Sequence, residues 1–275
     1  MAAIIALITL LGAVVVMILR LIMAVLAKHL QGTQGVMLPI ASAGAPRLSR
    51  YTSLRAEPHK LLYRDLEAES GLFERLATAR SVSRELVLTT SDLVQLPMTL
   101  NLLSNLDELG IRHYLLLART RQVCMALRPR AGLPCSWSSY LLNRRSRSGK
   151  PPRASPVEKM WLQRHHYLGR AIGAGLNVLL LDSDVLLSRS PYPYLHGAFG
   201  RFTAVVLSDS TASADPLHAN GGVWYVHNAS RRGPIRAIFE AFDAAVAQAI
   251  DHGSSKAGAL FDQQVPLLLA SSHIS

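Results

Sequence analysis

Five strand-length runs of this chain are apolar along almost their whole length, and helical patterns alternate with them. The runs are residues 86–89, 114–118, 177–181, 203–207 and 222–226. Apolar residues at three- and four-residue spacing predict helices over residues 97–109, 156–172, 234–250 and 261–269. Strands without a polar face are typical of a sheet that helices cover on both sides. The pattern therefore predicts an α/β fold, in which ligands bind beyond the C-terminal ends of the strands.

Composition excludes several other classes of protein. The 275 residues are 49% hydrophobic, which excludes a wholly disordered chain. Two cysteines are too few for a disulfide-dense scaffold or for a zinc site built on four cysteines. The net charge is +11, and residues 119–153 carry nine basic and no acidic residues. We interpret this segment, centred on residues 143–152, as a solvated insertion loop. No nucleic-acid-binding motif accompanies it, so no nucleic-acid partner is expected.

The N-terminal segment has a different character. Residues 2–19 carry no charge, and this length is near the minimum for a spanning helix. Arg20 interrupts the run, and residues 21–27 are apolar again. We therefore expect a transmembrane signal anchor at residues 1–27. A cleaved signal peptide and a buried core helix are the alternatives. A linker rich in Gly, Ser, Ala and Pro is expected over residues 28–80, and the main folded domain over residues 81–275.

Two carboxylates stand directly after the most apolar run. Asp182 and Asp184 flank Ser183 immediately after Leu181. Side chains at positions i and i+2 of a strand point the same way, so both carboxylates are expected to meet at one hard divalent cation. Such a cation can hold a diphosphate and stabilise it as a leaving group. One alternative is a turn in which each Asp caps backbone N–H groups. Another is a phosphatase of the haloacid-dehalogenase type.

Four blocks of the sequence, in this order, carry a family resemblance. They are Asn101–Leu115, Gly173–Pro191 with its Gly-Leu-Asn-Val-Leu-Leu-Leu-Asp-Ser-Asp-Val core, Asn220–Val226, and Asp262-Gln263. They resemble the nucleotide-diphospho-sugar transferases of plants and algae, glycosyltransferase family 77. The resemblance implies a GT-A-type, Rossmann-like mixed sheet flanked by helices. It also implies a nucleotide-sugar donor, a divalent cation that is usually Mn²⁺, and transfer with retention of the anomeric configuration.

The same resemblance assigns roles to residues of this chain. The donor-binding residues would be Thr89, Thr90, Asp182, Asp184, Asn220 and Gly221, and the catalytic residues would be Asp262 and Gln263. Asp182 and Asp184 would also hold the metal ion. Simpler explanations stay open: Asn220-Gly221 is a common hairpin-turn pair, Asp262 could cap the last helix, and Gln263 could lie on its surface. His165 and His166 are expected on a helix surface, because adjacent helical residues point apart.

The chain departs from the family at the end of its second expected strand. Members commonly have Ala-x-Asp there, whereas Arg119 and Thr120 follow Ala118 in this chain. An acidic group that helps to place the nucleotide or the metal is thus missing. This departure favours a second hypothesis, in which the chain is a catalytically inactive, GT-A-like glycan-binding or scaffold subunit of a Golgi complex.

The family resemblance also implies a compartment. Family members work in the Golgi lumen behind a type II membrane anchor, and Asn228-Ala229-Ser230 is an N-glycosylation acceptor. Cys124 and Cys135 could form a disulfide in such an oxidising compartment, although two unpaired buried thiols are equally consistent with the sequence. The positive charges after the apolar run favour a cytosolic C-terminal side instead. We give the resemblance precedence. The expected activity is transfer of arabinose, xylose or galactose from a nucleoside diphosphate sugar, such as a UDP-sugar, to a glycan or glycoprotein hydroxyl.

Overall fold

The computed structural model describes residues 60–128, 133–143, 155–208 and 219–251. The chain divides into two compact units, residues 1–50 and 51–275, and all described residues belong to the second. None of the helices in the described ranges is long and apolar enough to cross a membrane. The anchor expected at residues 1–27 and the helix expected at residues 261–269 lie outside the described residues.

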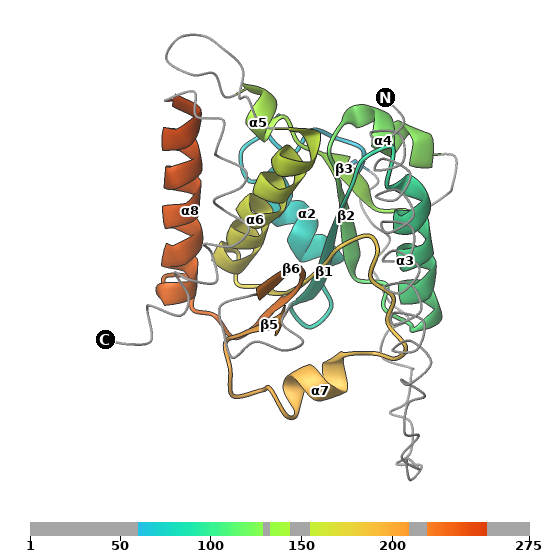
Figure 1. Cartoon of the computed structure of the whole chain (residues 1–275), viewed down its shortest axis with the longest axis vertical. Coiled ribbons are helices and arrows are strands. Elements are labelled where there is room, and N and C mark those ends of the chain that lie inside the picture. Colours follow the sequence, from blue (N-terminus) through green and yellow to red (C-terminus); the bar gives the residue numbers. More distant parts are fainter. Residues whose placement is uncertain (1–59, 129–132, 144–154, 209–218, 252–275) are drawn as a thin grey trace, which may run out of the picture. The chain divides into compact units, whose positions relative to one another are not determined.

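A six-stranded sheet of order β3-β2-β1-β4-β6-β5 forms the centre of the second unit (Figure 1). Its strands are β1 (Glu85–Ser91), β2 (Tyr114–Ala118), β3 (Cys135–Trp137), β4 (Asn177–Leu181), β5 (Ala204–Ser208) and β6 (Ala219–Val226). β1 pairs in parallel with β2 and β4, and β2 pairs in parallel with β3. β6 is antiparallel to both β4 and β5. The structure therefore confirms a mixed sheet and contains all five strands expected from the sequence.

Helices cover both faces of this sheet, as Figure 1 shows. α2 (Leu72–Arg80), α6 (Pro156–Gly173) and α8 (Pro234–Asp251) pack on one face, and α3 (Leu96–Glu108) and α4 (Arg121–Leu127) on the other. Successive side chains of β1 point to opposite faces, so Leu86 and Leu88 join the α6 cluster while Val87 joins the α3 cluster. β1, β2 and β4 are buried along their whole length, which explains why their sequences have no polar face.

Two segments that we expected to be irregular are structured. Residues 60–80, which we assigned to the linker, contain α2, and Leu66, Leu72 and Phe73 are fully buried. The described parts of residues 119–153, which we interpreted as a solvated loop, contain α4, β3 and α5 (Tyr140–Asn143). These elements are three to nine residues long. The helices among them have at most nine residues and complete too few turns to show a helical period, and β3 has only three residues.

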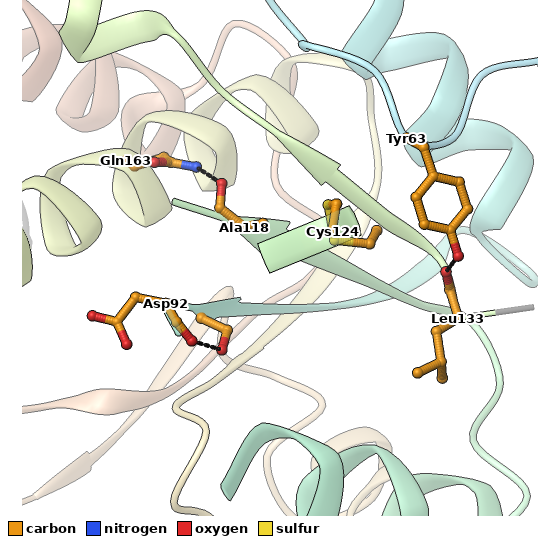
Figure 2. Close-up of a disulfide and its surroundings, with 8 residues drawn as sticks. Tyr63, Asp92, Ala118, Cys124, Leu133 and Gln163 are labelled. Carbon is orange, nitrogen blue, oxygen red and sulfur yellow. Dashed lines mark hydrogen bonds between the residues drawn. A yellow bond between two sulfur atoms is a disulfide. The ribbon is translucent and has the colours of Figure 1, made fainter. Parts of the chain in front are cut away.

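A disulfide between Cys124 of α4 and Cys135 of β3 holds one edge of the sheet together (Figure 2). Both cysteines are fully buried. Of the two alternatives, a disulfide or two free thiols, the structure contains the disulfide. The segment before α2 is attached at the same place. Tyr63 donates from its hydroxyl to the Leu133 carbonyl (2.7 Å) and from its backbone N–H to the Cys135 carbonyl (2.8 Å).

The two long helices α6 and α8 approach closely at Gly169. A Cβ atom at Gly169 would lie 2.7 Å from the Cβ of Phe239, closer than the two helices can tolerate without shifting. A Cβ at Gly173, one turn further along α6, would meet only the guanidinium of Arg236, at 3.2 Å. The first neighbour is a packed ring stem, and the second is the end of a flexible side chain.

Gly169→Ala is therefore expected to lower the free energy of unfolding by about 1–3 kcal/mol, although Ala is the better helix former. Gly173→Ala is the matched control, and it is expected to be neutral or slightly stabilising. Urea unfolding of both variants measures the difference. Equal stability of the two variants would contradict the close approach at Gly169.

A polar network occupies the N-terminal edge of the sheet, where the parallel strands begin. The Glu85 carboxylate accepts hydrogen bonds from Asn177 Nδ2 (2.7 Å) and from the Tyr225 hydroxyl (3.1 Å). It also lies 3.2 Å from Nε2 of His196 in α7 (Tyr192–His196). The network therefore attaches α7 to three strands at this edge.

His113 is buried beside this network and resists protonation. Its side chain is only 5% exposed, and Nε2 lies 2.7 Å from the Tyr192 hydroxyl. Burial, and then the positive charge of Arg80, lower the pKa of His113 from its usual 6.5 to about 4. The unfolded chain takes up this proton first as the pH falls, so acid favours the unfolded state between pH 6.5 and pH 4.

We expect the free energy of unfolding to fall in this window, with up to roughly 3 kcal/mol due to His113. His113→Gln keeps a polar side chain but cannot titrate, so the variant is expected to show a correspondingly smaller loss between pH 6.5 and pH 4. Urea unfolding at a series of pH values compares the two proteins. An equal loss of unfolding free energy in the two proteins would show that the pKa of His113 is the same in the folded and the unfolded state.

Candidate functional site

The C-terminal edge of the sheet, where the parallel strands end, holds a small pocket of about 60 Å³. It is lined by Thr90 of β1, Gln95 and Met98 at the start of α3, Met160 and Trp161 of α6, and Asp182, Ser183 and Asp184 after β4. β1 and β4 are adjacent and parallel, with Thr89 opposite Leu181, so their C-terminal ends meet here. The structure therefore brings three of the expected site residues, Thr90, Asp182 and Asp184, to one pocket.

The two carboxylates reach the pocket from a turn and not from a strand. β4 ends at Leu181, and the Val185 N–H donates to the Asp182 carbonyl (3.2 Å). The Asp182 N–H donates to the Gly222 carbonyl of β6 (2.7 Å), which fixes the start of the turn. Our expectation that the two side chains point the same way assumed a strand, and it does not apply to a turn. Both side chains nevertheless line the same pocket. The Asp182 side chain is 33% exposed, and Asp184 is exposed.

Arg164 of α6 is a charged residue at the site, and the sequence motifs did not indicate it. Its side chain is only 1% exposed, and its Nη1 donates to Oδ1 of Asp182. It stands between Met160 and Leu168 at four-residue spacing, and all three residues are buried. A charge inside an apolar helical stripe indicates a buried partner, because arginine is almost never buried without one. That signal was present in the sequence, and the resulting ion pair holds one oxygen of Asp182 in place.

The charges at the pocket favour a cation. Asp182 and Asp184 together outweigh Arg164 by one negative charge, so a diphosphate would be repelled unless a cation lay between them. Carboxylate oxygens are the ligands that hard divalent cations prefer, and Mg²⁺-type sites use one or two carboxylates together with substrate phosphates. Over the residues that the structure describes, no group of three or more His, Cys, Asp or Glu side chains is placed to hold a metal ion. A cation held by these two carboxylates would take its remaining ligands from water or from a bound phosphate.

Two buried acceptor atoms near the pocket lack a hydrogen-bond partner among the described residues. They are Oε1 of Gln95, which lines the pocket, and Oγ1 of Thr89. The backbone N–H of Gln95 donates to Oδ1 of Asp92 (2.9 Å), which fixes the residue at the start of α3. An orphaned acceptor in a polar pocket is satisfied by a ligand hydroxyl or N–H. Thr89 and Thr90 point to opposite faces of the sheet, and of the two only Thr90 lines the pocket.

Asn220 and Gly221 lie inside β6. This strand begins at Ala219, which pairs with Ser208 of β5, so the hairpin-turn explanation for the Asn-Gly pair is wrong. Gly222 accepts the hydrogen bond from Asp182, and the two preceding residues therefore continue along the same edge of the sheet. The backbone thus places Asn220 and Gly221 beside the turn that carries the two carboxylates.

The proposed catalytic pair, Asp262 and Gln263, lies outside the described residues. The direction of α8 shows at which edge of the sheet the described chain ends before them. α8 runs antiparallel to α6, because its early residue Arg236 donates to the Gly169 carbonyl, and its later residue Asp243 lies 2.9 Å from His166 Nδ1. α8 therefore ends at the C-terminal edge of the sheet, which is the edge that holds the pocket.

The adjacent histidines of α6 are not surface residues, contrary to our expectation. His165 is 1% exposed, and the His166 side chain is 12% exposed. His166 stacks on Tyr140, with ring centroids 3.7 Å apart. The reason is that α6 is covered by the sheet on one side and by α2, α5 and α8 on others, so that neighbouring positions are buried against different partners. Neither histidine lines the pocket.

Part of this domain is similar to a known protein family. Residues 109–232 match the nucleotide-diphospho-sugar transferase family. The matched range includes β2 to β6, Arg164 and both pocket carboxylates, whereas Thr90 precedes it. No curated protein sequence matches the chain.

Arg119 lies in the matched range, at the end of β2, where the resembling family commonly has an acidic residue two positions after Ala118. Its Nε atom is buried and has no hydrogen-bond partner among the described residues. Gln163 of α6 donates to the Ala118 carbonyl (3.2 Å), as Figure 2 shows, and thereby ties the end of β2 to α6. The position of the expected acidic residue is thus taken by the uncharged Thr120, which directly follows Arg119.

The Arg164–Asp182 pair generates a prediction about stability. Asp182→Asn removes the carboxylate that neutralises a buried guanidinium, so we expect the free energy of unfolding to fall by about 2–3 kcal/mol. Asp184→Asn, the matched control at an exposed position, is expected to change it by less than about 0.5 kcal/mol.

Adding Arg164→Met to Asp182→Asn removes both members of the pair and is expected to restore much of the lost stability. Denaturant unfolding of the wild type, Asp182→Asn, Arg164→Met and the double variant closes this double-mutant cycle. Additive losses in the double variant would show that the two side chains do not stabilise each other.

Proposed function

We propose that this chain is a nucleotide-sugar-dependent glycosyltransferase with a GT-A-type fold. The observation that carries the proposal is the meeting of Thr90, Asp182 and Asp184 in one pocket at the C-terminal edge of a largely parallel sheet. Ligands of such sheets bind at this edge, and residues 109–232 match a family of nucleotide-diphospho-sugar transferases. Position, chemistry and family match thus support the same type of ligand.

In this proposal the pocket binds the diphosphate end of the donor. Asp182 and Asp184 hold a divalent cation such as Mn²⁺, since they are the two carboxylates that line the pocket. When bound, the cation neutralises the diphosphate and makes it a better leaving group. The starts of α3 and α6 face the same edge, and helix N-termini favour anionic groups. Ser155 and Glu158 form a capping box that fixes the start of α6.

The other pocket residues orient the donor and exclude water. Gln95 Oε1 accepts a hydrogen bond from a donor hydroxyl or base N–H. Met98, Met160 and Trp161 form an apolar wall, which strengthens the electrostatic interactions inside the pocket. Arg164 keeps Asp182 oriented toward the donor. Each of these actions depends on the packing of α3 and α6 against the ends of β1 and β4.

The finer parts of the proposal come from the family resemblance. They are retention of the anomeric configuration, a donor of the arabinose, xylose or galactose class, a glycan or glycoprotein acceptor, and a Golgi membrane location behind a type II anchor. Asn220 and Gly221 would border the sugar, and Asp262 and Gln263 would face it from the chain that follows α8. The end of α8 at the pocket edge supports this last assignment, because the ten residues between Asp251 and Asp262 can span more than the width of the sheet edge.

Thr120 favours a second candidate function, an inactive GT-A-like subunit that binds glycans. A threonine in place of the family's acidic group removes a carboxylate that would help to hold a nucleotide or a metal at the end of β2. Such a subunit would lack donor turnover even when folded. The two functions therefore differ in nucleotide binding and hydrolysis and not in fold.

The deciding experiment is calorimetric titration of UDP into the full-length protein, with and without Mn²⁺. We expect binding that requires Mn²⁺ and that weakens at least about tenfold in Asp184→Asn, because one of two metal ligands is lost. Glu240→Gln, an exposed carboxylate on α8, is the matched control and is expected to bind like the wild type. Equal UDP binding with and without Mn²⁺ would contradict the metal site.

Turnover separates the two candidate functions. Slow hydrolysis of UDP-sugars by the Mn²⁺-loaded protein, measured as released UDP, is expected for an enzyme. A folded protein that binds no UDP in the presence of Mn²⁺, and releases none from any UDP-sugar, is the inactive subunit. Binding of UDP that requires Mn²⁺ argues against the inactive subunit.

A further inference from the structure

Arg119 carries a guanidinium group that the described part of the protein leaves without a partner. Its Nε atom is buried and forms no hydrogen bond with the described residues. None of the salt bridges within the described ranges includes Arg119. A guanidinium group is always charged, and burying a charge without a partner costs free energy. A partly buried, unpaired arginine therefore indicates a binding site for an anion.

Arg119 lies on the face of the sheet that holds the pocket. Its backbone N–H donates to the Ser91 carbonyl (2.9 Å), so the pairing of β2 with β1 continues one residue beyond Ala118. Ala118 packs with residues of α4 and Leu117 with residues of α6, so alternation directs Arg119 to the α6 side. Thr90 pairs with Leu117 and lines the pocket together with residues of α6. The guanidinium group therefore lies beside the pocket, on the β2 side of Thr90.

The acidic residue nearest to Arg119 along the neighbouring strand has other partners. Figure 2 shows Asp92 and Ala118 at the neighbouring ends of β1 and β2. The Asp92 Oδ1 atom accepts hydrogen bonds from the backbone N–H groups of Val94 and Gln95 (2.9 Å each). The Asp92 carboxylate thus fixes the turn into α3. Thr120 follows Arg119 in place of the family's acidic residue, so no carboxylate adjacent in the chain competes for the guanidinium group.

The unpaired polar atoms around the pocket fit a nucleoside phosphate. Oε1 of Gln95 is an acceptor without a partner among the described residues, and Nε of Arg119 is a donor without one. A ribose hydroxyl can donate to the first atom, and a phosphate oxygen can accept from the second. Arginine suits phosphate in particular, because the fork of its N–H groups matches the spacing of two phosphate oxygens.

The order of the strands indicates which phosphate Arg119 meets. β2, β1, β4 and β6 are neighbours in this order. In the proposed function the cation lies after β4, at Asp182 and Asp184, and the sugar lies on the β6 side, at Asn220. The sugar is bonded to the β-phosphate of the donor. The α-phosphate and the nucleoside therefore lie toward β1 and β2, and two strand spacings, about 10 Å, separate β4 from β2.

We propose that the Arg119 guanidinium group binds an oxygen of the donor's α-phosphate, on the side of the diphosphate that faces away from β6. This inference rests on the proposed function, because it takes the position of the cation and of the sugar from it. The cation and Arg119 then neutralise the diphosphate from two sides. Arg119 is a binding residue in this arrangement, and it adds a contact that depends on the phosphate and not on the metal ion.

Calorimetric titration of UDP into the full-length protein with Mn²⁺ tests this assignment. Arg119→Gln removes the charge and keeps a polar side chain, and we expect UDP binding to weaken about 10- to 100-fold. Arg121→Gln is the matched control and is expected to bind UDP like the wild type. Arg121 is exposed, and its guanidinium carbon lies 5.9 Å from the centroid of the Trp137 ring. Unchanged UDP binding in Arg119→Gln would overturn the proposal.

Smaller ligands show which part of the nucleotide meets the guanidinium group. UMP carries only the α-phosphate, so its binding is expected to weaken by a similar factor in Arg119→Gln. Uridine has no phosphate and is expected to bind the variant and the wild type equally. Arg119→Lys keeps the charge without the fork of N–H groups and is expected to restore part of the UMP binding. Equal weakening of UMP and uridine in Arg119→Gln would contradict the phosphate contact.

The stability of the protein without ligand separates a binding role from a structural one. Arg119→Gln removes an unpaired, partly buried charge, so we expect this variant to unfold at the same or a higher urea concentration than the wild type. A structural arginine would lose stability on the same substitution. An Arg119→Gln variant that is less stable without ligand and binds UDP normally would show that Arg119 supports the fold and not the donor.

A sugar carboxylate is the other oxyanion that a guanidinium group binds. If Arg119→Gln weakens the binding of UDP-glucuronate and leaves that of UDP and UDP-glucose unchanged, Arg119 binds the carboxylate and the α-phosphate assignment is wrong. A wild type that needs Mn²⁺ to bind UDP, with an Arg119→Gln variant that binds it equally well, overturns this inference alone. A folded wild type that binds no UDP with Mn²⁺ overturns the proposed function, and this inference with it.

Discussion

The complete burial of β1, β2 and β4 is the constraint on which the rest of this structure depends. A strand that is covered on both faces has no exposed side chain along its length, so polar chemistry is confined to the ends of the strands. The two ends of the sheet have accordingly different roles. One end holds a pocket with two carboxylates. The other holds the Glu85 network and α7.

The buried ion pair of Arg164 and Asp182 shows how the pocket depends on the core. Arg164 comes from the apolar stripe of α6, and the position of α6 is set by its packing on the sheet and against α8 at Gly169. A shift of α6 would move the guanidinium away from Asp182 and change the charge at the pocket. Helix packing and site electrostatics are therefore linked, although Gly169 itself does not line the pocket.

Burial and the length of an element decide which parts of this fold its sequence predicts. The sequence predicts the apolar strands and the long helices, because burial imposes a recognisable spacing of hydrophobic residues on them. The sequence does not predict α2, α4 and β3, because helices of seven to nine residues complete too few turns to show a helical period and β3 has only three residues. Asn220-Gly221 has the composition of a hairpin turn and lies in a strand, because pairing with β4 and β5 outweighs the local preference for a turn. His165 and His166 were misplaced because several elements surround α6.

The sequence by itself determined the fold class and the pair Asp182 and Asp184, since apolar periodicity and a motif at a strand end are local features of the chain. It also left two alternatives for Cys124 and Cys135, a disulfide or two unpaired buried thiols. Only the tertiary structure decided that Thr90 and not Thr89 lines the pocket, that Arg164 neutralises Asp182, and that Cys124 bonds to Cys135. The physical reason is that these contacts join segments 11 to about 90 residues apart. Their geometry is set by how strands pair and helices pack, and not by the residues adjacent to them in the sequence.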